Sequence, residues 1–334
     1  MKEFNLIISD LKKKVYHPVY FLMGEEPYYI DAVADFIAAN VLNEAEKEFN
    51  QSILYGRDVD VLTIISAAKR YPMMANHQVV IIKEAQNIKD IERLAPYFEN
   101  PLKSTLLVIC YKYKTLDKRK TFAKNLAKIA VVLESKKLYD NKIPEWINVY
   151  LKDKNYIIGP KASLLLTEFL GNDLSKISNE LDKLMLNLPE KSEITTAHIE
   201  QYIGISKDFN NFELQTALGK RNVLKVNRII NYFDKNQKDN PFVLTIAALF
   251  SYFSKILAYH YLPNKSNNNE VAAIIKVHPF FVKDYEMASK NYNIKKTVET
   301  ISYLREYDLK SKGVDNASAG PGELLKELMY KILH

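Results

Sequence analysis

The first 140 residues alternate between short runs of consecutive apolar residues and amphipathic stretches. Short continuous apolar runs are typical of strands that are buried on both faces. Between them, apolar residues recur at the three- and four-residue spacing of an α-helix. The expected strands cover residues 19–23, 52–55, 79–82, 106–111 and 130–133. Because such strands separated by helices indicate a parallel sheet covered on both faces, we predict an α/β domain over residues 1–140.

The strand pattern nearly disappears beyond residue 140, while helical spacing continues. Residues 141–205 are expected to form a small helical domain. Its helices cover 142–154, 160–170, 173–186 and 196–203. A linker then leads to a second helical domain over residues 206–334. The apolar stretch 242–262 in that domain contains Lys255 and His260, which favours a buried helix over a membrane span. The pattern thus predicts an α/β domain followed by two all-α domains.

Composition agrees with this globular, mainly helical picture. Of the 334 residues, 47% are hydrophobic and 26% are charged, which excludes a disordered chain. The formal net charge of +7 suits an anionic partner, and an ordinary solvated surface explains it equally well. The single cysteine, Cys110, excludes a disulfide framework and a cysteine-based metal site within the chain. Because the first residues lack an apolar signal core, we expect a cytoplasmic protein that is not tied to a membrane.

The turn after the first expected strand has the setting of a phosphate-binding loop without its chemistry. A strand, the glycine Gly24 and a helix opened by a proline follow one another. A phosphate loop also needs a lysine, but here Glu25 and Glu26 follow the glycine, and their charges repel a triphosphate. After the third strand, Lys83 and Glu84 stand where an ATPase carries an acidic pair for magnesium. These residues indicate a degenerate nucleotide site.

The sequence contains no other pattern that indicates catalysis or metal binding. Its six histidines are scattered, without the paired spacing that a zinc site on a helix requires. A Gly-x-Ser-x-Gly nucleophile elbow is also absent. We therefore expect no catalytic residue, no resident metal, no cofactor and no small-molecule substrate.

A pair of methionines follows the helix expected at 58–70. Pro72 interrupts that helix, and Met73 and Met74 come shortly before the third strand, with Tyr71 beside them. Two flexible thioether side chains suit a hydrophobic pocket on a partner. Burying both would contribute about 3–6 kcal/mol before any cost of binding. The residues alone nevertheless favour packing into the domain's own core.

A basic helical face is expected further along the chain, at Lys118, Arg119, Lys120, Lys124 and Lys128. The last three lie four residues apart, so they share one side of a helix. Such a face suits the phosphates of DNA, and a solvated surface is an equally good explanation.

Three segments together resemble the delta subunit of the bacterial DNA polymerase III clamp loader, and the likeness covers essentially the whole chain. Their order and spacing carry the resemblance rather than any single motif. The segments are VYFLMGEEPY at 19–28, GNDLSKISNELDKL at 171–184 and DLKSKG at 308–313. The resemblance implies a P-loop NTPase domain of the AAA+ type without ATPase activity. It further implies a helical lid and a helical collar that joins a ring-like pentamer.

In that family the delta subunit opens the ring-shaped beta sliding clamp, using a hydrophobic pair that enters a pocket on the clamp. By motif position this pair falls on Met73 and Met74, with Tyr71 beside them. The family often has Leu-Phe there, so the methionine pair is a departure. The resemblance shifts its interpretation from core to anchor. The implied partners are the beta clamp, the gamma/tau and delta-prime subunits and primer-template DNA, in a complex classed as a DNA-directed DNA polymerase.

Other functions would also fit an inert nucleotide site. A delta-prime-like loader subunit is one, although it would be expected to carry a Ser-Arg-Cys motif, which this sequence lacks. A helical nucleic-acid-binding adaptor unrelated to replication is another. An active ATPase is disfavoured by the missing lysine.

Overall fold

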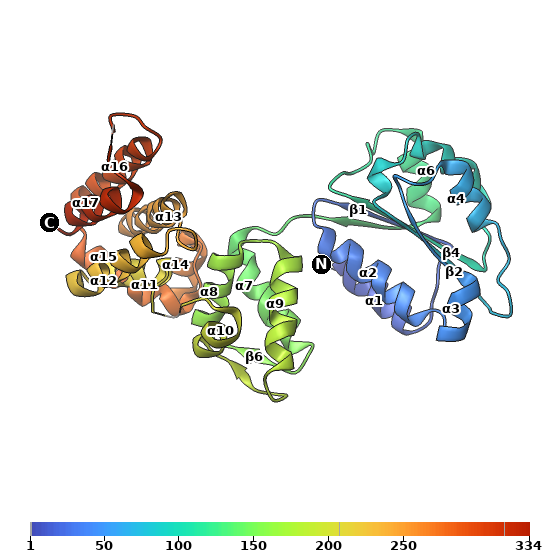
Figure 1. Cartoon of the computed structure of the whole chain (residues 1–334), viewed down its shortest axis with the longest axis horizontal. Coiled ribbons are helices and arrows are strands. Elements are labelled where there is room, and N and C mark those ends of the chain that lie inside the picture. The colour runs from blue at the N-terminus through green and yellow to red at the C-terminus, as the bar shows by residue number, and fades with distance from the viewer. Residues whose placement is uncertain (1, 207, 317) are drawn as a thin grey trace. The chain divides into compact units, whose positions relative to one another are not determined.

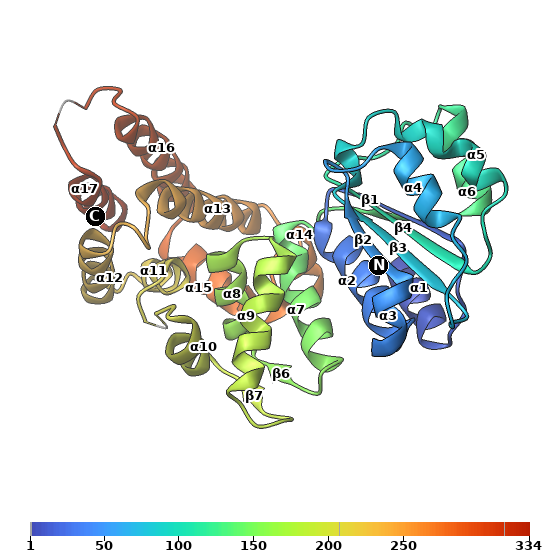
Figure 2. The same cartoon turned by 45° about the vertical axis from the view of Figure 1, so that its right-hand side comes forward.

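The computed structural model describes residues 2–206, 208–316 and 318–334 of the chain. It divides into two compact units (Figures 1 and 2). The first unit ends at Leu138 and the second begins at Tyr139.

Within the described residues, the first unit is built around a five-stranded parallel sheet. Its strands are β1 (Val19–Gly24), β2 (Gln51–Tyr55), β3 (Gln78–Lys83), β4 (Thr105–Lys112) and β5 (Val131–Ser135). Their order across the sheet is β2-β3-β4-β1-β5, and every neighbouring pair is parallel. The strands lie where the apolar runs predict them, which confirms the parallel α/β fold of this unit.

Helices cover both faces of this sheet. They are α1 (Lys2–Lys12), α2 (Pro27–Asn40), α3 (Glu44–Asn50), α4 (Val61–Ala68), α5 (Ala95–Glu99) and α6 (Thr121–Ile129), with 3-10 turns η1 (Ala85–Asn87) and η2 (Ile91–Leu94). Helices α1 and α2 lie on one face, and α4 and α6 lie on the other (Figure 1). Helix α3 ends where β2 begins.

The alternation of side chains along β1 explains why this strand is apolar throughout. Val19, Phe21 and Met23 belong to the hydrophobic cluster that includes helices α4, α5 and α6. Tyr20 and Leu22 point to the opposite face, toward α1 and α2, and are also buried. Burial on both faces requires apolar residues at successive positions.

The second unit is mainly helical. It begins with a 3-10 turn η3 (Asp140–Lys142) and the helices α7 (Ile143–Lys152), α8 (Pro160–Leu170), α9 (Leu174–Leu186) and α10 (Thr196–Ile203). Two short parallel strands, β6 (Ile157–Ile158) and β7 (Glu193–Ile194), pair between these helices. The hydrophobic pattern misses them because strands of two residues are too short to show a periodicity.

The remaining helices share one hydrophobic cluster. They are α11 (Asn211–Gly219), α12 (Val223–Lys235), α13 (Phe242–His260), α14 (Asn268–Ile275), α15 (Val282–Asn291), α16 (Ile294–Ser311) and α17 (Pro321–Leu333), with a turn η4 (Pro279–Phe281). The cluster runs from Leu214 to Leu333, and Leu164 of α8 packs against it. The expected boundary between lid and collar at residue 205 stays a prediction.

Helix α13 is the one described helix that is long and apolar enough to cross a membrane. On one side, Leu249, Phe253 and Ile256 are fully buried in the cluster of the second unit. On the other side, Val243 and Phe250 are exposed. The expectation of a buried helix therefore holds for one side of α13.

The backbone at Gly24 generates a stability prediction. Its φ is 137°, and a Cβ added there would lie 1.9 Å from the carbonyl oxygen of Ser135. We expect Gly24→Ala to destabilise the first unit by about 3 kcal/mol or more, because backbone strain and steric overlap add. Hydrogen exchange of the intact chain measures this loss for each unit separately.

Gly204→Ala is the matched control. Gly204 also has a positive φ, 86°, but nothing lies within 4 Å of the added Cβ. It should destabilise its own unit by only about 1 kcal/mol, through strain alone. Equally small losses at both glycines would show that the contact with Ser135 is unimportant.

Candidate functional site

The turn after β1 is tied to the end of β5 and to the segment that follows β4. The N–H of Gly24 donates to the carbonyl of Lys114 at 3.1 Å, and the N–H of Glu25 donates to the carbonyl of Ser135 at 2.9 Å. The hydroxyl of Ser135 donates to the carbonyl of Glu26 at 2.8 Å. A phosphate loop needs its N–H groups to converge on the ligand, whereas here they bind protein carbonyls.

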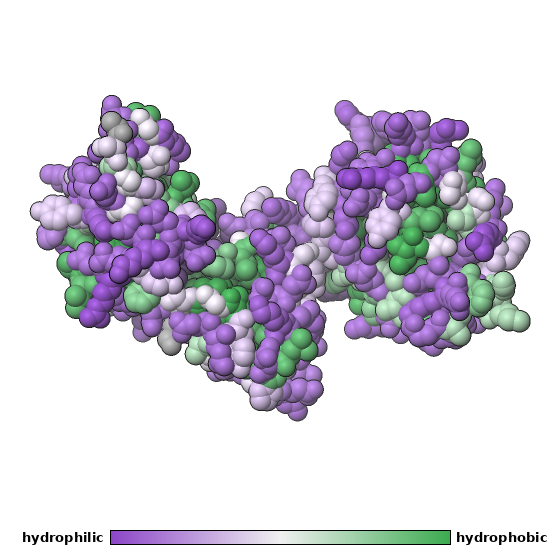
Figure 3. Space-filling model, viewed as in Figure 1, coloured by the Kyte–Doolittle hydropathy of each residue, from purple (hydrophilic) through white to green (hydrophobic). Residues whose placement is uncertain are grey.

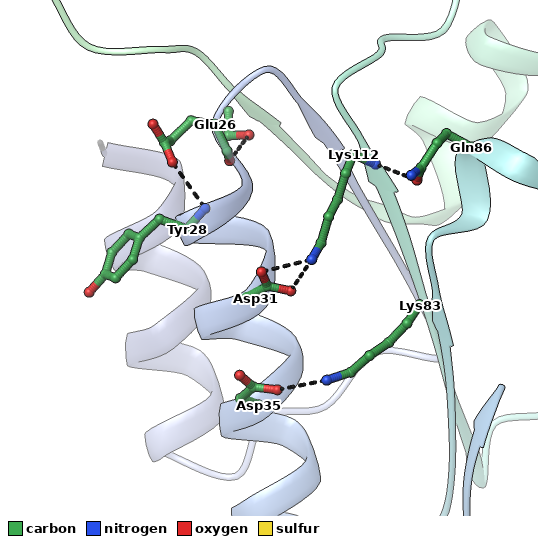
Figure 4. Close-up of polar contacts among 8 residues, drawn as sticks. Glu26, Tyr28, Asp31, Asp35, Lys83, Gln86 and Lys112 are labelled. Carbon is green, nitrogen blue, oxygen red and sulfur yellow. Dashed lines mark hydrogen bonds and ion pairs between the residues drawn. The ribbon is translucent and has the colours of Figure 1, made fainter. Parts of the chain in front are cut away.

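Glu26 occupies the N-terminus of α2 with its own negative charge. Its side chain is the N-cap of the helix and accepts a hydrogen bond from the N–H of Tyr28 at 3.1 Å (Figure 4). Only 3% of Glu26 is exposed. Because a helix N-terminus attracts anions, this carboxylate holds the place that a phosphate takes in a nucleotide site.

Two lysines from the sheet reach across to two aspartates of α2 (Figure 4). Lys112 Nζ lies 2.6 Å from one carboxylate oxygen of Asp31 and 2.8 Å from the other. Lys83 Nζ lies 3.4 Å from Asp35. Asp31 and Asp35 are four residues apart on the helix, so they face the sheet together. The sequence analysis missed this pair, although their spacing on an amphipathic helix is a signal for it.

Lys83 is therefore a structural cation at the end of β3. Partial burial disfavours its charged form, but Asp35 and Asp31 outweigh this and raise the pKa of Lys83. Glu84 adopts a left-handed conformation with a φ of 53°, and its carboxylate lies 3.6 Å from Arg57. No group of three or more possible metal-ligating side chains is found among the described residues. This arrangement favours the hypothesis of an inactive nucleotide site.

The methionine pair lies on the surface. The segment between α4 and β3 leaves 79% of Tyr71, 53% of Met73 and 99% of Met74 exposed. The interpretation favoured by the residues alone, packing into the domain's own core, is therefore wrong. Met74 has a left-handed φ of 52°. Hydrophobic patches appear elsewhere on the surface in Figure 3, and Val243 and Leu244 form another adjacent exposed pair, so exposure alone does not single out the methionines.

Asn50, which the sequence analysis did not single out, holds the backbone of this segment. Its side-chain oxygen accepts from the N–H of Met73 at 2.6 Å, and its side-chain nitrogen donates to the carbonyl of Met73 at 2.9 Å. The two residues are 23 positions apart. A lone asparagine before a strand carries no signal in the sequence for such a contact.

The predicted basic face is only partly available. Lys118 lies 2.6 Å from Glu134, Arg119 lies 2.8 Å from Asp117, and Lys120 lies 2.6 Å from Glu92. Lys124 and Lys128 on α6 form no ion pair with any residue that the structure describes. The sequence analysis grouped all of these cations because the carboxylates that neutralise Lys118 and Lys120 lie far away in the chain.

Comparison with known proteins places both units in one family. The family model "DNA polymerase III, delta subunit" matches residues 20–136, and its "C-terminal domain" model matches residues 208–324. Together they span well over half of the chain. The DNA polymerase III subunit delta of Bacillus subtilis (strain 168) is 27% identical over 318 residues, which are 91% of this chain and 90% of that protein.

One solved structure supports the fold. The DNA clamp loader delta protein of Bacillus subtilis matches with a TM-score of 0.54 and 24% identity, over 99% of each chain. The RuvB Holliday junction branch migration motor of Thermotoga maritima has a TM-score of 0.37 and 14% identity, over 87% of this chain and 85% of its own. The two family models and the Bacillus subtilis relative show that the chain belongs to the DNA polymerase III delta subunit family.

Proposed function

We propose that this chain is a clamp-loader delta subunit that binds the beta sliding clamp through Met73 and Met74 and favours the open ring. It would do so without hydrolysing ATP. The observation that carries the proposal is the exposure of two adjacent methionines on a turn whose backbone is fixed to the rest of the unit. Tyr71, which is also exposed, adds aromatic surface beside them.

The gross burial energy of the methionine pair can be compared with the preference that a strong shift of a two-state equilibrium requires. Burying both side chains contributes about 3–6 kcal/mol before costs. A ligand that must shift a two-state equilibrium from 1:99 to 99:1 needs about 5.5 kcal/mol of preference for one state. Contacts available only on the open clamp would supply this preference, and contacts equal in both states would not.

The contacts at the Gly24 turn support a loader in which other subunits bind ATP and this chain does not. Glu26 fills the helix N-terminus, and Lys83 and Lys112 are paired with α2. ATP would then be bound by the gamma/tau subunits. The helical region 206–334 would form the collar that holds this chain beside them and beside delta prime.

DNA contact would fall mainly to Lys124 and Lys128. Their charges are not neutralised within the described chain, so they are free to displace counterions from DNA phosphates. Contacts of this kind hold primer-template DNA without reading its sequence. A chain that works with these partners would act in the cytoplasm.

Replacing both methionines tests the anchor. Met73→Ala/Met74→Ala should fold normally and bind the clamp at least about 100-fold more weakly, because most of the buried apolar area is lost. Surface plasmon resonance on immobilised clamp measures the loss. Leu6→Ala removes another exposed apolar side chain, from α1, and should leave binding unchanged. Full affinity in the double variant would refute the anchor.

A nucleotide titration tests the inactive site. Isothermal calorimetry of the isolated chain with Mg-ATP should give no saturable heat up to about 1 mM, since Glu26 repels phosphate at the helix N-terminus. A saturable signal that ADP displaces would contradict the proposal.

Paired lysine variants test the DNA surface. In the assembled loader, Lys124→Ala/Lys128→Ala should weaken binding to primed DNA and reduce the slope of log affinity against log salt by about 2. Lys118→Ala/Lys120→Ala removes the same charge from lysines that are already paired, and its slope should change less. Equal changes in both variants would count against this assignment. Fluorescence anisotropy across a salt series provides the measurement.

A further inference from the structure

We propose that Asn50 is a positioning residue that preorganises the Met73–Met74 turn for the clamp. This inference rests on the proposed function, because it assigns a role within the same binding element. It concerns a residue that is buried and does not itself reach a partner, since only 2% of Asn50 is exposed.

Both the oxygen and the nitrogen of the Asn50 side-chain amide form hydrogen bonds. Its oxygen accepts from the N–H of Met73, and its nitrogen donates both to the carbonyl of Met73 and to the carbonyl of Glu46, the latter at 3.0 Å. One planar group thereby pairs with both backbone groups of a single residue. This resembles the pairing of two strands in a sheet, and it fixes the position and the orientation of the Met73 peptide groups.

Asn50 is itself held rigidly. It is the last residue of α3, and the next residue, Gln51, begins β2 in register with Val79 of β3. The bond to Glu46 fixes the side chain against its own helix. The turn is therefore fastened to two regular elements of the sheet domain and not to another loop.

The start of the segment is also fastened to this domain. The side-chain nitrogen of Gln78 donates to the carbonyl of Ala67 at 3.0 Å, and the hydroxyl of Tyr97 donates to the carbonyl of Ala68 at 3.3 Å. These bonds hold the end of α4. Between α4 and β3, Asn50 supplies the support in the middle of the segment.

This geometry separates a fixed backbone from free side chains. Met74 has a left-handed φ of 52°. This conformation is unfavourable for residues other than glycine and persists only where the surrounding structure holds it. Its side chain is almost completely exposed. A backbone that is already ordered loses less entropy on binding, so the affinity of the methionines increases without any new contact.

Substitution of Asn50 measures this contribution. Asn50→Ala removes the bonds to Met73 while leaving both methionines in place, and we expect it to bind immobilised clamp about tenfold more weakly. Asn40→Ala is the matched control, because Asn40 ends α2 and donates to the carbonyl of Phe36 at 2.8 Å but does not contact the turn. It should bind like wild type. A folded Asn50→Ala chain with wild-type affinity overturns the proposal.

A double-mutant cycle separates positioning from general damage to the unit. If Asn50 acts through the methionines, the effect of Asn50→Ala should shrink by more than half in a Met74→Ala background. A purely structural role would leave the two effects additive. Additive losses therefore overturn the assignment even when each single variant binds weakly.

Hydrogen exchange of the wild-type chain tests the bond without any substitution. The Met73 amide should exchange at least about tenfold more slowly than an unprotected amide, because it donates to a buried side chain. Exchange at the unprotected rate overturns the proposal. If wild type does not bind the clamp, the proposed function fails, whereas the exchange rate of Met73 still decides whether Asn50 orders the turn.

Discussion

The close approach of Gly24 to Ser135 is the contact on which the first unit depends. It brings the end of β1 against β5 so tightly that no side chain fits between them. The same contact directs the N–H groups of the turn to protein carbonyls and places Glu26 at the start of α2. A turn of this kind in a nucleotide hydrolase would hold phosphate. Here it closes the α/β domain with interactions supplied entirely by the chain.

The methionine turn and the Gly24 turn lie at opposite edges of one parallel sheet. Asn50 and Met73 precede the first residues of β2 and β3, whereas Lys83 and Gly24 end β3 and β1. All strands of the sheet run in the same direction, so its amino edge carries the turn and its carboxyl edge carries the ion pairs. A closed carboxyl edge gives the unit a stable scaffold, and the amino edge presents a rigid apolar surface. This arrangement places the proposed clamp-binding turn and the ion pairs of α2 at separate edges of the sheet.

Local pattern predicts most of the fold, but few of the contacts around the candidate site. Apolar runs locate the strands because both faces of the sheet are buried. The absence of a phosphate-binding lysine can be recognised from the residues next to Gly24 in the sequence. Contacts between residues that are far apart in the sequence cannot be predicted from local pattern. Lys112 meets Asp31 across 81 positions, and Asn50 meets Met73 across 23. The position of the methionine turn depends on such contacts. For this reason the local pattern favoured burial of the two methionines, whereas the structure exposes them.

In the proposed function, this chain alone shifts the clamp toward its open form. Fluorescence energy transfer between dyes on the two sides of one clamp interface measures opening directly. Saturating chain without nucleotide should lower the transfer efficiency, because contacts restricted to the open ring stabilise it. Unchanged transfer, with binding demonstrated under the same conditions, would mean that the chain holds both clamp states equally and would contradict the account.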